Sequence, residues 1–197
     1  MGMPRFESAE VGNLELTWLV PLSLIGTVCG WLYFVSEHAS EALSHAIGER
    51  PVLKAMLAGL ALAICGTVLP YTMFAGETQA DVLMETYLTI PAGVLIATGL
   101  VKAMLTPALI NLGWRGGHFF PVIFSGVSLG YGLAILTGAD PVFCVAVCTA
   151  STMGAVMRQP VMVVGLLLMC FPLKGIVCMI IAAAIAAGIP LPKPLRK

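Results

Sequence analysis

Long stretches without a charged residue are the feature of this sequence that most limits its fold. Uncharged runs extend over residues 16–36, 55–76, 116–139 and 175–192. At about 1.5 Å per helical residue, each run is long enough to cross, or nearly cross, a hydrocarbon core of roughly 30 Å. Two further apolar stretches, 86–114 and 141–173, carry one charge each. The pattern predicts an all-α, multi-pass membrane protein.

Composition separates this chain from soluble domains. Hydrophobic residues make up 59% of the 197 residues and charged residues only 10%, whereas about one quarter of the residues in soluble domains are charged. The formal net charge is zero, which gives no electrostatic basis for a nucleic-acid partner. The six cysteines all lie in apolar runs and are expected to be buried hydrophobic residues rather than metal ligands. No metal and no cofactor is expected.

Three parts are predicted along the chain: a polar N-terminal segment at 1–15, a transmembrane helical domain at 16–192 and a basic C-terminal tail at 193–197. The stretch 141–173 is longer than one ordinary span. We therefore predict two shorter helices that meet near Pro160, because proline disrupts a helix interior. Because basic residues flank several loops, their distribution does not decide which way the chain is oriented in the membrane.

Individual helices are predicted from flanking signals. The first helix starts near Leu16, carries Pro21 in its first turns and continues to Ile47. Pro51 is placed for a new helix start. Between residues 91 and 132, glycine and proline recur at eleven positions and predict broken helices: Pro91, Gly93, Gly99, Pro107, Gly113, Gly116, Gly117, Pro121, Gly126, Gly130 and Gly132. In a bilayer, such breaks occur only inside protein or beside a water-filled cavity, so they predict a transport site.

The segment from Gly113 to Pro121 carries the most specific chemistry. A glycine-rich turn leads here into a helix that is predicted to start at the proline. The first N–H groups of a helix lack partners within it, and the helix dipole adds about half a positive charge. Such a helix start can hold an anion, and Gly116 and Gly117 let the anion approach the backbone. A tight packing bend is the alternative interpretation.

Two other clusters of polar residues are better explained by structural roles than by a functional site. Glu77, Asp81 and Glu85 are spaced four apart and would share one helix face, but a solvated loop or short interfacial helix explains them better than a metal site does. His38 and His45 lie with carboxylates on an amphipathic extension. A membrane enzyme built on these residues has no nucleophile, so a solvated face is the preferred interpretation.

Seven residues resemble the pattern of the chloride channel (CLC) family. The pattern has a basic residue, a threonine and then a glycine turn running into GGxFxP, matched here by Lys102, Thr106, Gly113, Gly116, Gly117, Phe119 and Pro121. Arg158-Gln159-Pro160 resembles the Arg-x-Pro element of the family. The resemblance covers most of the chain and implies the second of two inverted repeats of tilted helices, in a subunit that works as a homodimer.

The resemblance also implies roles for individual residues. The main-chain N–H groups of His118 and Phe119 contribute to the anion site that Gly116, Gly117 and Phe120 surround. Lys102, Thr106 and Arg115 belong to the anion pathway, although Lys102 also fits a side chain that extends towards the interface. Gly113, Pro121, Arg158 and Pro160 are expected to shape turns. His118 has a proton-carrying or a packing role, and Phe119, Phe120 and Phe124 line a constriction or simply pack.

The expected function is transport of chloride or a similar halide by a CLC-like channel or transporter half, in the plasma (inner) membrane of a prokaryote. Family elements such as the serine-bearing GSGIP turn and the gating glutamate are absent from this sequence, and Met169 replaces an acid found in many members. We therefore expect half of a split transporter, a truncated product, or self-assembly in opposite orientations. The alternative is a non-conducting subunit or fragment that binds a full-length relative.

Overall fold

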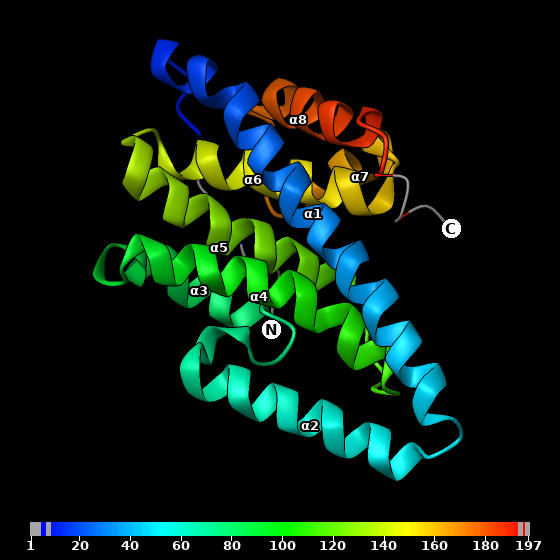
Figure 1. Cartoon of the computed structure of the whole chain (residues 1–197). Helices are drawn as coiled ribbons and strands as arrows, with labels where there is room; N and C mark the ends of the chain where they lie inside the picture. Colours follow the sequence, from blue (N-terminus) through cyan, green and yellow to red (C-terminus); the bar gives the residue numbers. More distant parts are fainter. Residues whose placement is uncertain (1–4, 7–8, 193–194, 196–197) are drawn as a thin grey trace.

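The computed structural model describes residues 5–6, 9–192 and 195, and over these residues it contains helices and no strand. Two short 3₁₀ helices, Pro70–Thr72 and Tyr87–Thr89, flank α3. The α-helices, labelled in Figure 1, are α1 (Asn13–Ile47), α2 (Pro51–Val68), α3 (Glu77–Thr86), α4 (Ala92–Asn111), α5 (Phe119–Thr137), α6 (Pro141–Met157), α7 (Pro160–Leu167) and α8 (Ile176–Gly188). The predicted all-α class is confirmed, as is the division of 141–173 into two helices that meet near Pro160.

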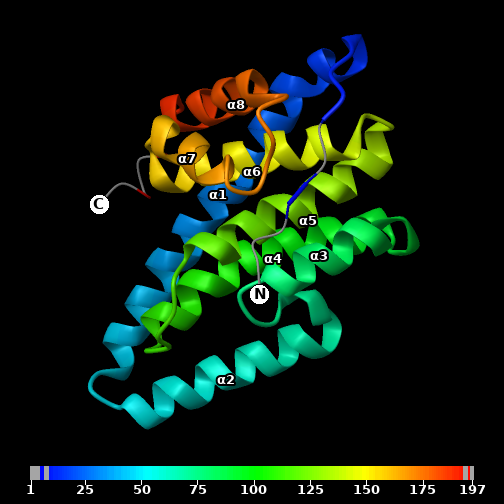
Figure 2. The same cartoon turned by 180° about the vertical axis from the view of Figure 1, so that it is seen from behind.

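The core lies between α5 and α6. Every residue from Val122 to Ala134 of α5 and from Phe143 to Ala155 of α6 is buried. α4 packs on the other side of α5, and α8 packs on α6, so that these helices form successive layers (Figure 1). α1 crosses the layers diagonally and contacts both α4 and α6, as the view from behind in Figure 2 also shows. A central helix pair that is buried all round explains the uninterrupted apolar runs of α5 and α6.

Glycines inside α5 bring its backbone close to α6. A Cβ added at Gly126 would lie 2.4 Å from the Cα of Thr149, and one added at Gly130 would lie 2.4 Å from the Cα of Val145. The prediction that these glycines break the helix is wrong, because α5 is continuous through both. They are small contact residues, which membrane helices use to approach one another. Breaks of the predicted kind lie instead in the loop 112–118 and at 158–159.

Replacing Gly126 with alanine is expected to destabilise the bundle by about 1 to 3 kcal/mol, because the added methyl group meets backbone atoms that cannot move aside cheaply. Thermal unfolding in detergent, followed by the loss of the monodisperse chromatographic peak, measures the effect. The matched control is Gly59→Ala on α2, where nothing lies within 4 Å of the added Cβ. Equal stability of the two variants would contradict the tight α5–α6 contact.

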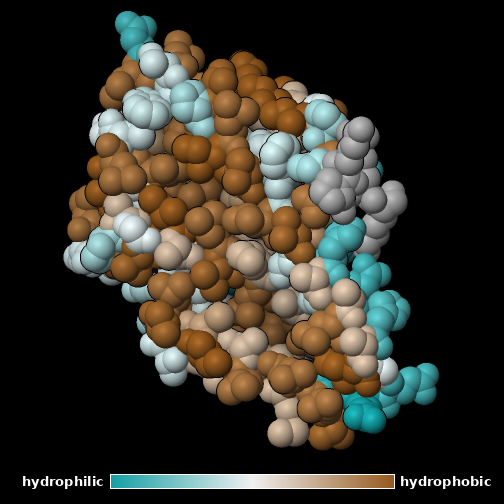
Figure 3. Space-filling view, in the orientation of Figure 1, coloured by the Kyte–Doolittle hydropathy of each residue, from teal (hydrophilic) through white to brown (hydrophobic). Residues whose placement is uncertain are grey.

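Among the residues that the structure describes, four helices are long and apolar enough to cross a membrane, namely α1, α2, α4 and α5. α1 has 35 residues and is about 50 Å long, which exceeds a hydrocarbon core of roughly 30 Å. Figure 3 shows a mainly apolar surface with polar residues gathered at the two ends of α1. The C-terminal part of α1 is held on α4: the Ser36 hydroxyl donates to the Met104 carbonyl (Oγ–O 2.6 Å), and the Asn111 amide donates to the Ser40 hydroxyl (Nδ2–Oγ 2.9 Å).

α2 lies at the edge of the molecule, separated from the layers of the core (Figure 1). Ala58 is the only buried residue among those of α2, all of which the structure describes. Its five most exposed large apolar residues recur at every fourth position and form one stripe along the helix: Val52, Met56, Leu60, Ile64 and Val68. This stripe, which we call the α2 face, is left for lipid or for another protein.

The N-terminal segment packs more closely than its polar composition suggested. The Phe6 ring stacks on Phe171, with ring centroids 4.4 Å apart, and the Phe6 N–H donates to the Cys170 carbonyl (N–O 2.9 Å). α1 begins at Asn13, three residues before the predicted domain boundary at residue 16. The charged residues of the predicted basic tail, Lys193, Arg196 and Lys197, lie outside the described residues.

Candidate functional site

A pocket of about 400 Å³ lies beside the turn that joins α4 to α5. Residues from α2, from the loop between α2 and α3, from α4, from the α4–α5 turn and from the first turn of α5 form its walls. They are Leu62, Met73, Phe74, Ala75, Lys102, Thr106, Leu109, Ile110, Trp114, Arg115, Gly116, Gly117 and Pro121. This set includes two cations and, among the described residues that line the pocket, no carboxylate.

Lys102 is the buried cation of the pocket, with 4% of its surface exposed. Its ammonium group donates to the Thr72 carbonyl (Nζ–O 2.7 Å) and to the Phe74 carbonyl. An ammonium group has three N–H donors, so two carbonyls leave one donor for another acceptor. Burying a charge is costly unless polar groups or a counter-ion compensate it. Two carbonyl dipoles from the α2–α3 loop compensate it only in part, so a positive potential remains in the pocket.

Thr106 lies one helical turn after Lys102 on α4. Its hydroxyl donates to the Lys102 carbonyl (Oγ1–O 2.8 Å), a local bond typical of threonine within a helix. The hydroxyl proton is therefore engaged within α4, although Thr106 lines the pocket. To donate to an anion, this side chain would first have to break the bond to its own helix.

The α4–α5 turn is open at its two adjacent glycines. Gly113 has φ +96° and ends α4, with its N–H donating to the Ile110 carbonyl (N–O 3.0 Å). Gly116 and Gly117 are exposed and have no positive φ, and nothing lies within 4 Å of a Cβ added at either. These two glycines are therefore not needed for an unusual backbone conformation. Their missing side chains leave space in the pocket and expose the backbone to it.

α5 begins at Phe119 with His118 as its N-cap, two residues before the predicted start at Pro121. No side chain caps this end of the helix. Within the described residues, no backbone carbonyl accepts from the N–H groups of Gly116, Gly117 or His118. The unpaired N–H groups and the helix dipole give the end of α5 a partial positive charge that favours anions.

The residues predicted to form the anion site are brought together only in part. Gly116 and Gly117 line the pocket, together with the predicted pathway residues Lys102, Thr106 and Arg115. The remaining three, His118, Phe119 and Phe120, are not among its lining residues. The His118 ring stacks on Phe119, with centroids 4.5 Å apart, while Phe120 borders a separate cavity of about 10 Å³ with Gly76 and Cys170.

Comparison with known proteins decides the family. The sequence matches the family model described as voltage gated chloride channel over residues 3–190. The chain belongs to this family. No curated protein matches the chain. The crystal structure of a CLC-type fluoride/proton antiporter matches with a TM-score of 0.77 and 21% sequence identity, over 100% of this chain and 50% of that one.

The CLC resemblance and the CLC-like fold predicted from sequence motifs are thus confirmed. CLC proteins are channels and transporters in membranes, and the apolar helices of this chain agree with a multi-pass integral membrane protein. The chain spans half the length of the antiporter that it matches.

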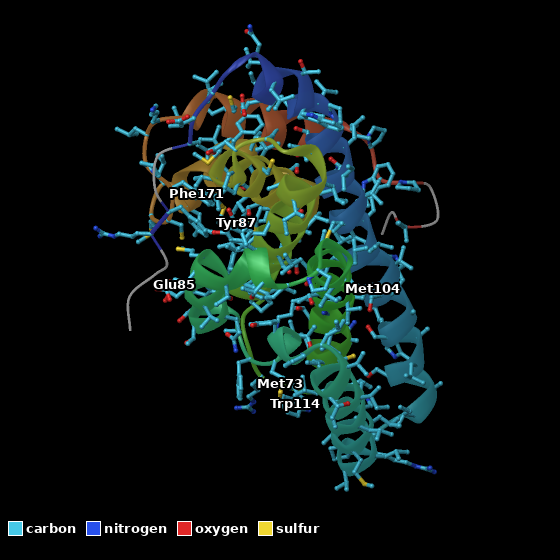
Figure 4. The ribbon with its side chains drawn as sticks, turned by 90° about the vertical axis from the view of Figure 1, so that its left-hand side faces the viewer. Met73, Glu85, Tyr87, Met104, Trp114 and Phe171 are labelled. Atoms are coloured by element: carbon cyan, nitrogen blue, oxygen red, sulfur yellow. The ribbon has the colours of Figure 1, made fainter. Side chains whose placement is uncertain are left out.

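In this CLC chain, sequence reasoning missed the α2–α3 loop as part of the pocket. Met73, Phe74 and Ala75 form one wall, and Phe74 is 77% exposed with φ +59°. Met73 and Trp114, both labelled in Figure 4, line this same pocket. One signal was present: the uncharged run 55–76 continues well beyond the end of α2 at Val68.

Two predicted structural residues of the CLC pattern lie away from the pocket. Arg158 caps the C-terminus of α6 in a left-handed conformation, with φ +58°. Its guanidinium group donates to the Ile189 carbonyl (Nη1–O 2.6 Å) and to the Ala186 carbonyl (Nη1–O 3.4 Å), at the C-terminus of α8. Pro160 is the first residue of α7. The turn between α6 and α7 is therefore also bound to the end of α8. The contact is favourable because a cation stabilises the negative C-terminal end of a helix.

The acidic residues Glu77, Asp81 and Glu85 lie on α3, so of the two structures left open, a loop and a short helix, the segment forms the helix. Within the described residues, no group of three His, Cys, Asp or Glu side chains is placed to hold a metal ion. Ala80 and Leu83 are the buried residues of α3. Its apolar face therefore packs on the bundle.

Proposed function

We propose that this chain carries small anions, chloride or a similar halide, across the membrane as part of a CLC channel or transporter. The observation that carries the proposal is the pocket wall, in which Lys102, Arg115 and the glycines before α5 adjoin one space that no carboxylate of the described residues lines. In an apolar surrounding, such a wall attracts an anion and repels a cation.

The proposed anion contacts come from both ends of the wall. Lys102 offers its remaining N–H donor from the buried side, and the N–H groups of Gly116 and Gly117 offer donors from the turn before α5. Main-chain donors suit a transported ion because they hold it with partial rather than full charges. Arg115 is exposed, and we assign it to attracting anions towards the pocket.

We further propose that another chain, or a second copy of this one, completes the pathway in the plasma membrane of a prokaryote. Two observations support this. The chain spans half the length of the antiporter that it matches, and the α2 face is apolar and uncovered. The same observations favour a second candidate function, in which the chain is a non-conducting subunit that binds a full-length relative.

The test is halide efflux from liposomes that contain the chain purified through an affinity tag, together with whatever copurifies from its native membrane. The proposed function predicts efflux of chloride above protein-free liposomes, carried by a dimer of the chain or by a complex with a chain of similar length. A well-folded sample without efflux would overturn it. Copurification of a longer transporter, whose efflux is unchanged when this chain is omitted, would establish the second candidate instead.

A further inference from the structure

We propose that the α2–α3 loop, residues 69–76, is a gate of the pocket, and that the halide itself opens this gate by competing for the Lys102 ammonium group. The inference rests on the proposed function, because it takes the halide to bind beside Lys102. In an empty pocket the ammonium group holds the loop closed. When a halide binds, the ammonium group turns to the halide and releases the loop.

Lys102 connects the loop to α4 through two of the three N–H donors of its ammonium group. It donates to the Thr72 carbonyl (Nζ–O 2.7 Å) and to the Phe74 carbonyl. Lys102 is only 4% exposed, so water offers few competing acceptors, and hydrogen bonds to the charge are strong in these apolar surroundings. The position of the loop therefore depends on what else the ammonium group binds.

The loop is held in a strained conformation at Phe74. This residue has φ +59°, in the left-handed region that is costly for a side chain with a Cβ, and such strain persists only while the surroundings hold it. The Phe74 ring is 77% exposed, so its packing contributes little to that hold. The bond from Lys102 reaches the carbonyl of the strained residue itself. Weakening this bond therefore lets the backbone relax.

Residues on both sides of Phe74 are anchored, which confines the movement to a short segment. Thr72 is fully buried, and its N–H and its hydroxyl both donate to the Leu69 carbonyl (N–O 2.9 Å, Oγ1–O 2.7 Å). On the other side, the backbone of Gly76 lies against Phe124, since an added Cβ would come within 2.5 Å of the Phe124 Cβ. The segment between these two anchors is the part that can move.

A halide competes with the two carbonyls for the same ammonium group. It first meets the remaining N–H donor of Lys102. Two opposite charges attract one another more strongly than a charge attracts a carbonyl dipole, above all in an apolar surrounding. The bonds to the carbonyls weaken once the halide compensates the charge. The bond to Phe74 is lost first, because its loss relieves strain, whereas Thr72 is held by its own bonds to Leu69.

Movement of Phe74 changes how the pocket opens. Phe74 lines the pocket while most of its surface is exposed, so its ring stands at an open side. Gly116 and Gly117 line the pocket from the α4–α5 turn and are exposed as well. A halide that reaches Lys102 past these glycines therefore opens a second way out at Phe74. Because the halide binds the open state better, its arrival shifts the loop towards that state.

Hydrogen exchange of a peptide covering residues 70–77 tests the gate. It is measured on the full chain in detergent, in potassium chloride and in potassium gluconate of equal ionic strength. Gluconate is a large, strongly hydrated anion that does not replace a halide. We expect exchange to be about tenfold faster in chloride, a change of roughly 1.4 kcal/mol in the free energy of opening, and the effect to saturate as chloride is raised. A peptide from α3 should exchange equally in both salts.

Two substitutions at Phe74 separate the strain from the ring. Glycine takes a positive φ at no steric cost, so Phe74→Gly is expected to lose most of its response to chloride. Alanine keeps the Cβ and the strain, so Phe74→Ala is expected to keep the response, although both variants lack the ring. The matched control is Leu173→Gly, at an exposed residue between α7 and α8 that has no positive φ. It should respond to chloride as the wild type does.

The outcomes distinguish the gate from the proposed function. Equal or slower exchange in chloride, with chloride efflux from liposomes intact, would overturn the gate and leave the proposed function standing. A full response in Phe74→Gly would overturn it too, since strain then has no part in the opening. Faster exchange in chloride from a chain without efflux supports the chloride-operated loop and counts against the pathway. A chain with neither response nor efflux would contradict both proposals.

Discussion

Replacing Gly117 with tryptophan is expected to reduce halide efflux to the level of protein-free liposomes while the protein still folds and inserts. The reason is geometric. Gly117 is exposed, has no positive φ, and has nothing within 4 Å of an added Cβ. A large side chain is therefore accepted by the backbone, and because Gly117 lines the pocket, we expect it to occupy the pocket and cover the N–H groups before α5. An anion then loses both its space and its main-chain donors.

Gly93→Trp is the matched control for this prediction. Gly93 lies in the first turn of α4, is exposed, has open space at its added Cβ, and does not line the pocket. We expect normal efflux from this variant, measured with the same halide electrode on liposomes of equal protein content. Normal efflux from Gly117→Trp would remove the α4–α5 turn from the pathway. Equal loss in both variants would show that bulk anywhere on α4 or the following turn disturbs transport.

The helix boundaries were largely predictable because proline and charge mark them locally. Pro51, Pro141 and Pro160 each stand at the first position of a helix, where the missing N–H costs nothing. Pro121 misled the prediction, because it is the third residue of α5 rather than its start. A proline fits anywhere in the first turn, so its position alone leaves the start of a helix uncertain by a few residues.

The glycines show what a sequence pattern leaves undetermined. Gly113 ends a helix with a positive φ, whereas Gly126 and Gly130 lie in a continuous helix against α6. All three were expected to mark breaks. A glycine that allows a turn and a glycine that allows a neighbouring helix to pack closely cannot be distinguished in a sequence. The distinction depends on what packs beside it, which is a tertiary property.

The sequence predicted those residues of the candidate site that belong to one local motif, and it missed the residues outside that motif. Lys102, Thr106 and the residues from Arg115 to Gly117 were selected from one stretch of sequence, and all of them line the pocket. The opposite wall comes from residues 73–75, about thirty residues earlier in a loop without charge or motif. Hydrogen bonds from Lys102 join the two segments, and no periodicity in the sequence indicates them.

Lys102→Met is expected to lower the stability of the protein by about 3 kcal/mol and to suppress halide efflux. Methionine keeps the length of the side chain but donates no hydrogen bond, so the Thr72 and Phe74 carbonyls lose their charged partner. A buried carbonyl without a partner costs about 1 to 3 kcal/mol. Phe74 also has φ +59°, a conformation that costs a non-glycine residue about 1 to 3 kcal/mol and persists only while its surroundings hold it.

The α2–α3 loop should therefore become more mobile when Lys102 is replaced. Its mobility distinguishes two roles of Lys102, holding the loop by hydrogen bonds and attracting the anion by charge. Hydrogen exchange of a peptide covering residues 70–77 is expected to become faster in Lys102→Met and to stay slow in Lys174→Met, which removes an exposed lysine elsewhere. Arg115→Gln should lower efflux without affecting the loop, because no hydrogen bond from Arg115 holds it among the described residues. If Lys102→Met left both exchange and efflux unchanged, the buried cation would neither hold the pocket wall nor act on the anion.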